Sequence, residues 1–154
     1  SQEQRVIFES KVDELIRAAS GTTAAVDAVI GELDAVKATL GRSTTDGSLY
    51  ERAHAIQQQI REARDVLAGN EQRGYYNDYE IMSVQARLWH ARFDPGSSAQ
   101  GPTAAQQESY RIGRKLYDET VARLTRLVDS EYAGLKQAMD AAKVPWTPGR
   151  GLQE

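Results

Sequence analysis

The sequence has no cysteine, only four prolines and few aromatic residues. The lack of cysteine excludes disulfides, thiolate metal sites and thiol nucleophiles, although it does not identify a cellular compartment. Aromatic residues make up 7% of the chain, so a core has to be built mainly from aliphatic side chains and alanine. Because proline is the strongest helix breaker, its scarcity leaves room for long helices.

Long apolar runs and basic blocks are also missing. No stretch approaches the roughly 18 apolar residues that a membrane span needs. The formal net charge is -3, with 19 basic and 22 acidic side chains. Nucleic acids and anionic membranes both require a concentrated positive face, so we expect neither as a partner.

The length of 154 residues predicts one domain over 1–154 with a sizeable core. The chain begins with Ser1 and not with methionine, from which we expect a processed protein or a domain excised from a larger one.

The first 40 residues carry a continuous heptad seam, which predicts one helix over 3–40. Its apolar or small positions alternate in steps of four and three: Phe8, Val12, Leu15, Ala19, Thr22, Val26, Val29, Leu33, Val36 and Leu40. Gly21 costs such a helix about 1 kcal/mol relative to alanine. Since the seam keeps its phase across Gly21, we expect no break there.

Three further helices are predicted over 49–68, 79–93 and 104–143, followed by an extended tail over 144–154. In the short helix we expect Ile81, Val84, Leu88 and also Trp89 to face inward. Thr103 is a suitable N-cap for the last helix, and Gln106 can complete a capping box with it. Glu131 falls on the apolar stripe of that helix, so Tyr132 is expected to take its place.

The fold class follows from these helices. Helices of about 40 residues have to pack along each other. The sequence therefore predicts an all-α, elongated antiparallel helical bundle of three main helices plus one shorter helix. A coiled-coil homodimer writes the same heptad pattern, so that alternative stays open.

The two histidines offer little for a metal or catalytic site. Glu51 and His54 have the Glu-x-x-His spacing of di-iron bundles, but only one copy is present. We therefore interpret them as part of a solvated helix face, and His90 as a residue at a helix C-terminus. We expect no catalytic residue, no metal and no cofactor.

One aromatic cluster is present, formed by Tyr75, Tyr76, Tyr79 and Trp89. Aromatic side chains of this kind can stack on sugars or anchor a protein partner. The alternative interpretation, which we favour, is that they close the bundle where the second helix stops.

The tail KVPWTPGRGLQE brings helix breakers together. Pro145 has no N–H and forces Val144 out of the helical region, so the last helix should end near Lys143. We expect Trp146 to fold back on the bundle, with Pro148 and Arg150 completing a tail latch.

Four features form a pattern: the tail segment VPWTPGR, the helix start PTAAQQESYRIG, the early stretch SKVDELIRAASGTTAAVDAV, and the tryptophans at 89 and 146. The pattern resembles the C-terminal helical domain of bacterial sortilin-like proteins built on Asp-box (neuraminidase-type) β-propeller repeats, which are often labelled glycosyl hydrolases. The resemblance implies that propeller and signal peptide lie outside this chain, that the whole protein is exported to the periplasm or secreted, and that this chain carries no active-site positions.

The functional hypothesis is accordingly a non-catalytic structural or interaction domain whose partner is the rest of its parent chain or another protein. An alternative is a glycan- or peptide-binding module that uses the aromatic cluster at Tyr75, Tyr76, Tyr79 and Trp89. A weaker alternative is a metal-dependent bundle enzyme.

Overall fold

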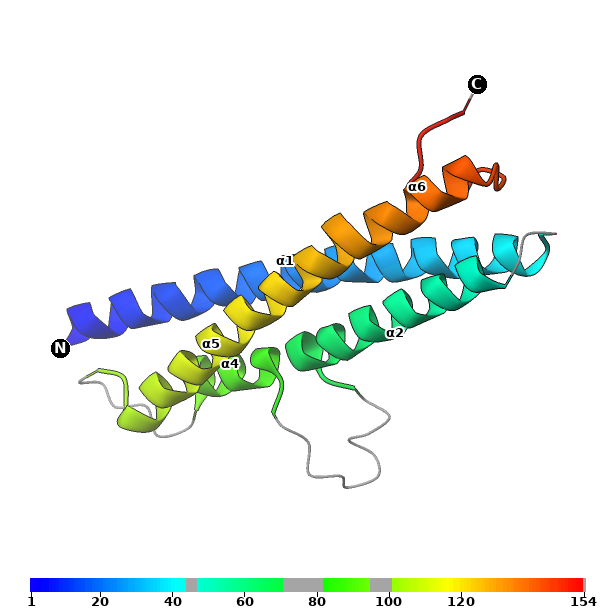
Figure 1. Ribbon diagram of the computed structural model, residues 1–154. Coiled ribbons are helices and arrows are strands. Elements are labelled where there is room, and N and C mark those ends of the chain that lie inside the picture. Colours follow the sequence, from blue (N-terminus) through cyan, green and yellow to red (C-terminus); the bar gives the residue numbers. More distant parts are fainter. Residues whose placement is uncertain (44–46, 71–81, 95–100, 154) are drawn as a thin grey trace. The chain divides into compact units, whose positions relative to one another are not determined.

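A computed structural model describes residues 1–43, 47–70, 82–94 and 101–153. Its elements in chain order are α1 (Gln2–Gly41), α2 (Ser48–Ala68), α4 (Val84–Phe93), α5 (Ala104–Arg126), η1 (Leu127–Tyr132) and α6 (Ala133–Ala141) (Figure 1). The described residues contain no β-strand, so the predicted all-α class is confirmed, and the contacts are those of packed helices.

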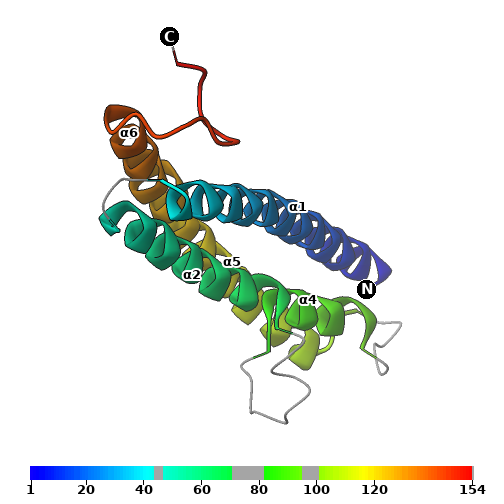
Figure 2. The same ribbon diagram turned by 90° about the vertical axis from the view of Figure 1, so that its right-hand side faces the viewer.

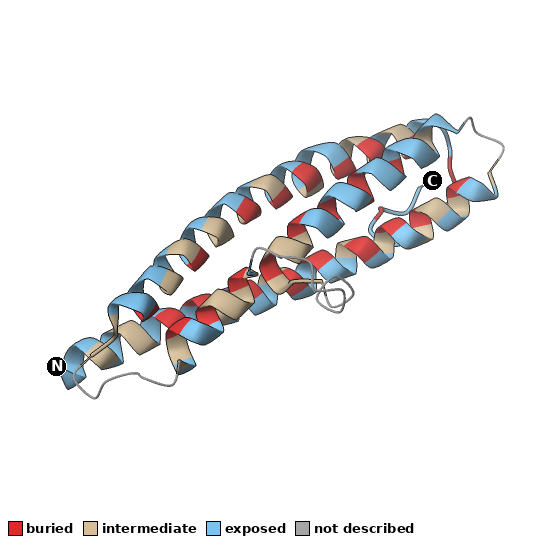
Figure 3. Ribbon diagram, turned by 90° about the horizontal axis from the view of Figure 1, so that it is seen from below, coloured by how far each residue is buried: buried red, intermediate tan, exposed pale blue. Residues whose placement is uncertain are grey.

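Helix α1 runs without a break through Gly21, as the continuous seam predicts. Figure 3 shows the buried face as a regular stripe along the helix. The fully buried seam residues are Val12, Leu15, Ala19, Val26, Leu33, Val36 and Leu40. Phe8, Thr22 and Val29 are half-buried. Burial along the seam outweighs the intrinsic helix penalty of Gly21.

The contacts divide the chain into two compact units. Unit 1 comprises Ser1–Thr23 and Arg64–Val121, and unit 2 comprises Ala24–Ala63 and Ala122–Glu154. Each unit therefore takes part of α1, part of α2 and part of α5. The single domain expected over 1–154 stays a prediction.

In unit 1, α1 and α4 run in opposite directions. Arg92 near the end of α4 reaches Asp13 at 2.9 Å, while Gln85 near its start reaches Thr23 at 3.4 Å. Helix α5 runs in the direction opposite to α4. Its tight packing on α4 is visible at Gly113, where an added Cβ would lie 3.2 Å from Leu88.

Helices α1 and α5 run in the same direction in unit 1, as the first and third helices of an up-down-up bundle do. Phe8 lies edge-on to Tyr110, with ring centroids 5.9 Å apart. Further along both helices, Thr22 Oγ1 lies 3.1 Å from the Tyr117 hydroxyl. Helix α4 runs opposite to α1, and α5 runs opposite to α4. Helix α5 therefore has the same direction as α1.

In unit 2, α1 and α2 form an antiparallel pair. Lys37 contacts His54 at 2.8 Å, and one turn earlier in α1 Asp34 contacts Gln57, one turn later in α2, at 2.7 Å. The buried apolar residues of α2 are Ala53, Ile56, Ile60 and Ala63 in unit 2 and Leu67 in unit 1. Gln57 is also buried, and it satisfies its amide through Asp34, Lys37 and the carbonyl of Ile30.

The last helix changes its winding where the predicted stripe weakened. Between α5 and α6 the six residues of η1 form a π-helix, in which each backbone hydrogen bond spans five residues in place of four. Buried Leu127 is therefore followed by buried Tyr132, five residues later, and Glu131 stays exposed. The expected replacement of Glu131 by Tyr132 on the stripe is confirmed, and the π-helix supplies the mechanism.

Both ends of this last helical stretch are capped. At its start, Thr103 N–H donates to Gln106 Oε1 at 2.9 Å, and Gln106 N–H donates to Thr103 Oγ1 at 3.1 Å. The predicted capping box is confirmed.

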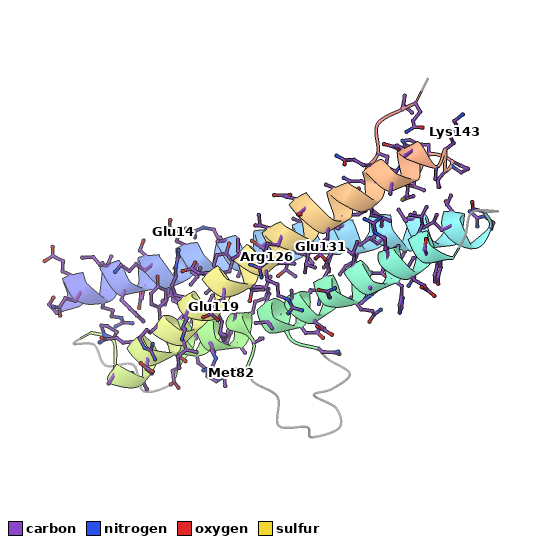
Figure 4. All side chains as sticks on the ribbon, in the orientation of Figure 1. Glu14, Met82, Glu119, Arg126, Glu131 and Lys143 are labelled. Carbon is purple, nitrogen blue, oxygen red and sulfur yellow. The ribbon has the colours of Figure 1, made fainter. Side chains whose placement is uncertain are left out.

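The last helix ends in a Schellman motif. Val144 N–H donates to the carbonyl of Met139 at 3.0 Å, and Lys143 N–H donates to that of Asp140 at 3.1 Å. Lys143, at the end of α6 in Figure 4, occupies the left-handed position with φ 57°. Val144 and Met139 are both buried, as is common for the two residues that flank this motif. The predicted helix end near Lys143 is confirmed.

No described helix combines the length and the apolar character that crossing a membrane demands.

Candidate functional site

Helix α4 has an inner face that forms part of the core of unit 1. Ser83 caps the helix by accepting a hydrogen bond from Ala86 N–H at 3.1 Å. The helix therefore begins at Val84, five residues later than the predicted start at 79. Of the residues in between, 79–81 lie outside the described part. Val84, Leu88 and Ala91 are buried.

The inward orientation expected for Trp89 is wrong. The Trp89 side chain is 62% exposed. Successive residues of an α-helix are about 100° apart around the axis, so a residue next to buried Leu88 turns away from the core. Because Val84, Leu88 and Ala91 face the core, Trp89 lies on the opposite side of the helix.

An apolar surface consequently lies on the outer side of α4. We call it the α4 outer surface and define it as Met82, Trp89 and Phe93, which are all exposed. Figure 4 shows Met82 beside the start of the helix. Half-buried Ala86, Trp89 and Phe93 follow the 3-4 spacing of one helix face, whereas Met82 precedes the N-cap Ser83 and lies outside the helix.

Two rings form the centre of the α4 outer surface. The centroids of Trp89 and Phe93 are 4.5 Å apart with an interplanar angle of 53°. The Arg92 guanidinium lies 4.9 Å from the Phe93 ring and also binds Glu9 at 3.4 Å and Asp13 at 2.9 Å. The ion pairs fix the last turn of α4 on α1, so the backbone that carries the two rings is held in place.

Of the predicted aromatic cluster, the structure places only Trp89. Tyr75, Tyr76 and Tyr79 lie outside the described residues, as does Ile81. Phe93 and Met82, which complete the α4 outer surface, were not anticipated from the sequence. The spacing of Phe93, four residues after Trp89 on one helix, is the signal that could have identified it.

The Glu-x-x-His pair on α2 is engaged differently from a metal site. His54 Nδ1 lies 2.8 Å from Lys37 Nζ, which also donates to Gln57 Oε1 at 3.1 Å. An ammonium group can only donate, so Nδ1 of His54 is the acceptor. In the described part of the chain, no group of three or more His, Asp or Glu residues could hold a metal ion.

His90 lies in the last turn of α4, as the sequence suggested, and its side chain is exposed. Its carbonyl accepts the N–H of Asp94, the C-cap residue, at 3.1 Å.

The C-terminal tail folds back through Arg150 and not through Trp146. Figure 2 shows the tail leaving the end of α6 and turning. The side chain of Arg150 is only 1% exposed. Its donors reach Asp140 Oδ1 at 2.7 and 3.0 Å, the Pro145 carbonyl at 2.7 Å and the Val144 carbonyl at 3.0 Å.

Trp146 and Pro148, the other two residues of the expected latch, lie on the outside. Trp146 remains 53% exposed, so the expectation that its ring folds back on the bundle is wrong. Its indole N–H donates to the carbonyl of Arg150 at 2.7 Å, which closes the turn. The buried residues of the tail recur at every third position: Val144, Thr147 and Arg150.

The chain matches no known protein family, and neither curated proteins nor solved structures give a match.

Proposed function

We propose that this chain is a non-catalytic helical interaction module, and that the α4 outer surface is where its protein partner docks. The observation that carries the proposal is the exposed pair Trp89 and Phe93, whose rings are in tilted contact, on a helix whose opposite face is fully buried. Exposed aromatic side chains held on rigid elements are typical anchors of protein interfaces.

The partner that fits this surface is an amphipathic helix. The 3-4 spacing of Ala86, Trp89 and Phe93 along α4 is the spacing with which one helix packs on another. Arg92 is already paired with Glu9 and Asp13, but Arg87 has no ion pair among the described residues and α4 contains no acidic residue, so a helix with an acidic residue beside its apolar stripe is complementary.

The parent of the module is proposed on the tail pattern alone. In that proposal the module is the C-terminal accessory bundle of an exported propeller protein labelled a glycosyl hydrolase, and the docking helix belongs to that parent chain or to a separate protein. Catalysis, if the parent has any, resides outside this chain.

A photo-crosslinker at position 89 tests the proposal in the natural source of the protein. The residue Trp89 is replaced by p-benzoylphenylalanine, and Glu119, which is exposed on α5, carries the same crosslinker as a control. We expect a discrete protein adduct from position 89 only. The purified partner should then bind the wild-type chain at least tenfold more tightly than Trp89→Ala, with the melting temperature lowered by no more than about 4 °C. Equal adducts from both positions, or equal affinities, would contradict docking at this surface.

A glycan-binding function is the second candidate, because an exposed tryptophan ring can stack on a sugar. In a glycan array, this candidate predicts a signal that Trp89→Ala abolishes. A protein-docking surface predicts no glycan signal above that of the Trp89→Ala variant.

A further inference from the structure

A groove of about 590 Å³ lies in unit 1, between the start of α1 and the residues that lead into α5. Its walls include Gln4, Ile7, Phe8 and Lys11 on α1, and Pro102 and Gln107 on the other side. The volume is within the range of about 300–1,000 Å³ found for ligand sites. None of the residues above forms part of the α4 outer surface, so this groove is a separate feature.

The floor of the groove is apolar and held in place. The Phe8 ring is fixed by its edge-on contact with Tyr110, with a centroid distance of 5.9 Å and an interplanar angle of 72°. The other wall is fixed by the capping box of Thr103 and Gln106 and by the hydrogen bond from Gln107 Nε2 to the Pro102 carbonyl at 3.2 Å. A ligand would therefore meet a largely preformed surface.

The charge in the groove is positive and unpaired. Among the described residues that line it, Lys11 is the only charged one and none is acidic. Among the described residues, Lys11 has neither an ion pair nor a hydrogen bond from its side chain. A carboxylate beside an apolar group is the chemistry that complements an unpaired ammonium group beside Ile7 and Phe8.

The polar groups on the rim suit a peptide backbone. Gln4 accepts a hydrogen bond from the N-terminal ammonium group through Oε1, which leaves its Nε2 donor unused among the described residues. Gln107 donates through Nε2, which leaves its Oε1 acceptor unused in the same part of the structure. One amide donor and one amide acceptor match the C=O and N–H of a peptide group.

The shape of the groove favours an extended ligand over a small molecule. Small ligands are typically 70–90% enclosed by their sites, whereas this groove is more open than enclosed. A peptide can lie across an open wall, because it gathers contacts over a longer surface.

We propose that this groove binds a peptide segment in which an acidic side chain stands beside an apolar one, with the carboxylate on Lys11 and the apolar side chain on Ile7 and Phe8. The site does not depend on the α4 outer surface, so either can fail without the other.

Selection from a phage library of random heptapeptides tests this proposal. Three immobilised baits are compared: the wild-type chain, Lys11→Gln and Ile7→Ser. Both replaced residues are exposed in unit 1, and circular dichroism verifies that the variants fold. We expect the wild-type bait to enrich peptides with Asp or Glu next to a large apolar residue, and Lys11→Gln to lose the acidic preference. Equal acidic enrichment on wild type and Lys11→Gln, or no enrichment over Ile7→Ser, would overturn the proposal.

The best selected peptide then maps the site by nuclear magnetic resonance titration. Shift changes should be confined to the start of α1 and the start of α5. Replacing its acidic residue by the matching amide should weaken binding about threefold to fivefold, as expected for one partly solvated ion pair. Lys11→Arg should retain the affinity, and Val6→Ser, an exposed apolar neighbour outside the groove, should leave it unchanged. Loss of binding in Val6→Ser equal to that in Ile7→Ser would contradict the assigned position.

Discussion

Arg150 donates from Nε and Nη2 to the same oxygen of Asp140, Oδ1, at 3.0 and 2.7 Å. The guanidinium is buried, whereas the carboxylate is partly open to solvent. The same guanidinium donates to the carbonyls of Pro145 and Val144. One side chain thus connects the tail to α6 and satisfies the backbone of the turn that follows the helix.

Arg150→Ala is expected to destabilise the protein by about 2–4 kcal/mol, because it leaves the buried Val144 carbonyl without a donor and removes the partner of the Pro145 carbonyl and of Asp140. Arg150→Lys should recover less than half of the loss, since an ammonium group cannot reproduce the planar fork. Urea denaturation measures both. Arg114→Ala, which removes an exposed i,i+4 pair with Asp118, is the control and should cost about 0.5 kcal/mol. Equal costs at both positions would contradict the role of Arg150.

Gly149 lies where the tail approaches α1. Its φ is 88°, and an added Cβ would overlap the carboxylate of Glu32. Gly149→Ala should therefore cost about 1–2 kcal/mol for the backbone conformation, plus the cost of displacing Glu32. Adding Glu32→Ala should remove the second part only. Gly151→Ala, where nothing lies within 4 Å, is the control and should be neutral. A Gly149→Ala variant as stable as Gly151→Ala would show that the tail is not held in this conformation.

Lys143 is in a left-handed conformation that usually belongs to glycine at the end of a Schellman motif. Lys143→Gly should stabilise the protein by about 0.5–1 kcal/mol, because the relief of the left-handed strain exceeds the added freedom of the unfolded chain. Lys115→Gly makes the same chemical change inside α5 and should destabilise by about 1 kcal/mol. Thermal melting of both variants checks the opposite signs. Destabilisation by both replacements would contradict the motif.

Tyr132 combines burial with a hydroxyl that has no hydrogen-bond partner among the described residues. Burial raises its pKa to about 12, and the charge of Glu32 adds to the increase while that of Arg150 opposes it. An unfolded tyrosine ionises near pH 10. The resulting stability is complete below about pH 10 and is lost as the pH rises through about 12.

Tyr132→Phe should remove this alkaline loss and raise stability at neutral pH by about 1 kcal/mol, since it deletes an unsatisfied hydroxyl. The ring contact with Lys136, at 4.6 Å, is available to phenylalanine as well. Tyrosinate absorbance followed by pH titration should lose one late-ionising group in the variant. An unchanged titration curve would show that Tyr132 ionises like an exposed tyrosine.

The long helices were predictable because their signals are local. Heptad spacing indicates the buried face of α1 across Gly21, and Thr103 with Gln106 identifies the start of α5 through two side chains three residues apart. The position of Tyr132 was predictable as an alternative to Glu131. The π-helix that places it was not predictable, because the extra residue in a helical turn shows in the sequence only as an interruption of the apolar spacing.

The surface features were less predictable for physical reasons. Trp89 is apolar, and periodicity alone admits it to either side of a short helix until Val84, Leu88 and Ala91 fix the phase. Arg150 is charged, so its burial depends on the turn after Lys143 bringing it to Asp140. Such an arrangement results from tertiary geometry that no spacing rule encodes.

The central claim is that the outer side of α4 binds a protein partner, whereas its inner side is part of the hydrophobic core. The unfolding free energies of Leu88→Ala and Trp89→Ala, two neighbouring residues on one helix, test it most directly. We expect Leu88→Ala to cost about 2–5 kcal/mol, because the side chain is fully buried. Trp89→Ala should cost about 1 kcal/mol or less, since it loses mainly the exposed contact with Phe93. A Trp89→Ala loss as large as that of Leu88→Ala would contradict the claim, because it would make Trp89 part of the core.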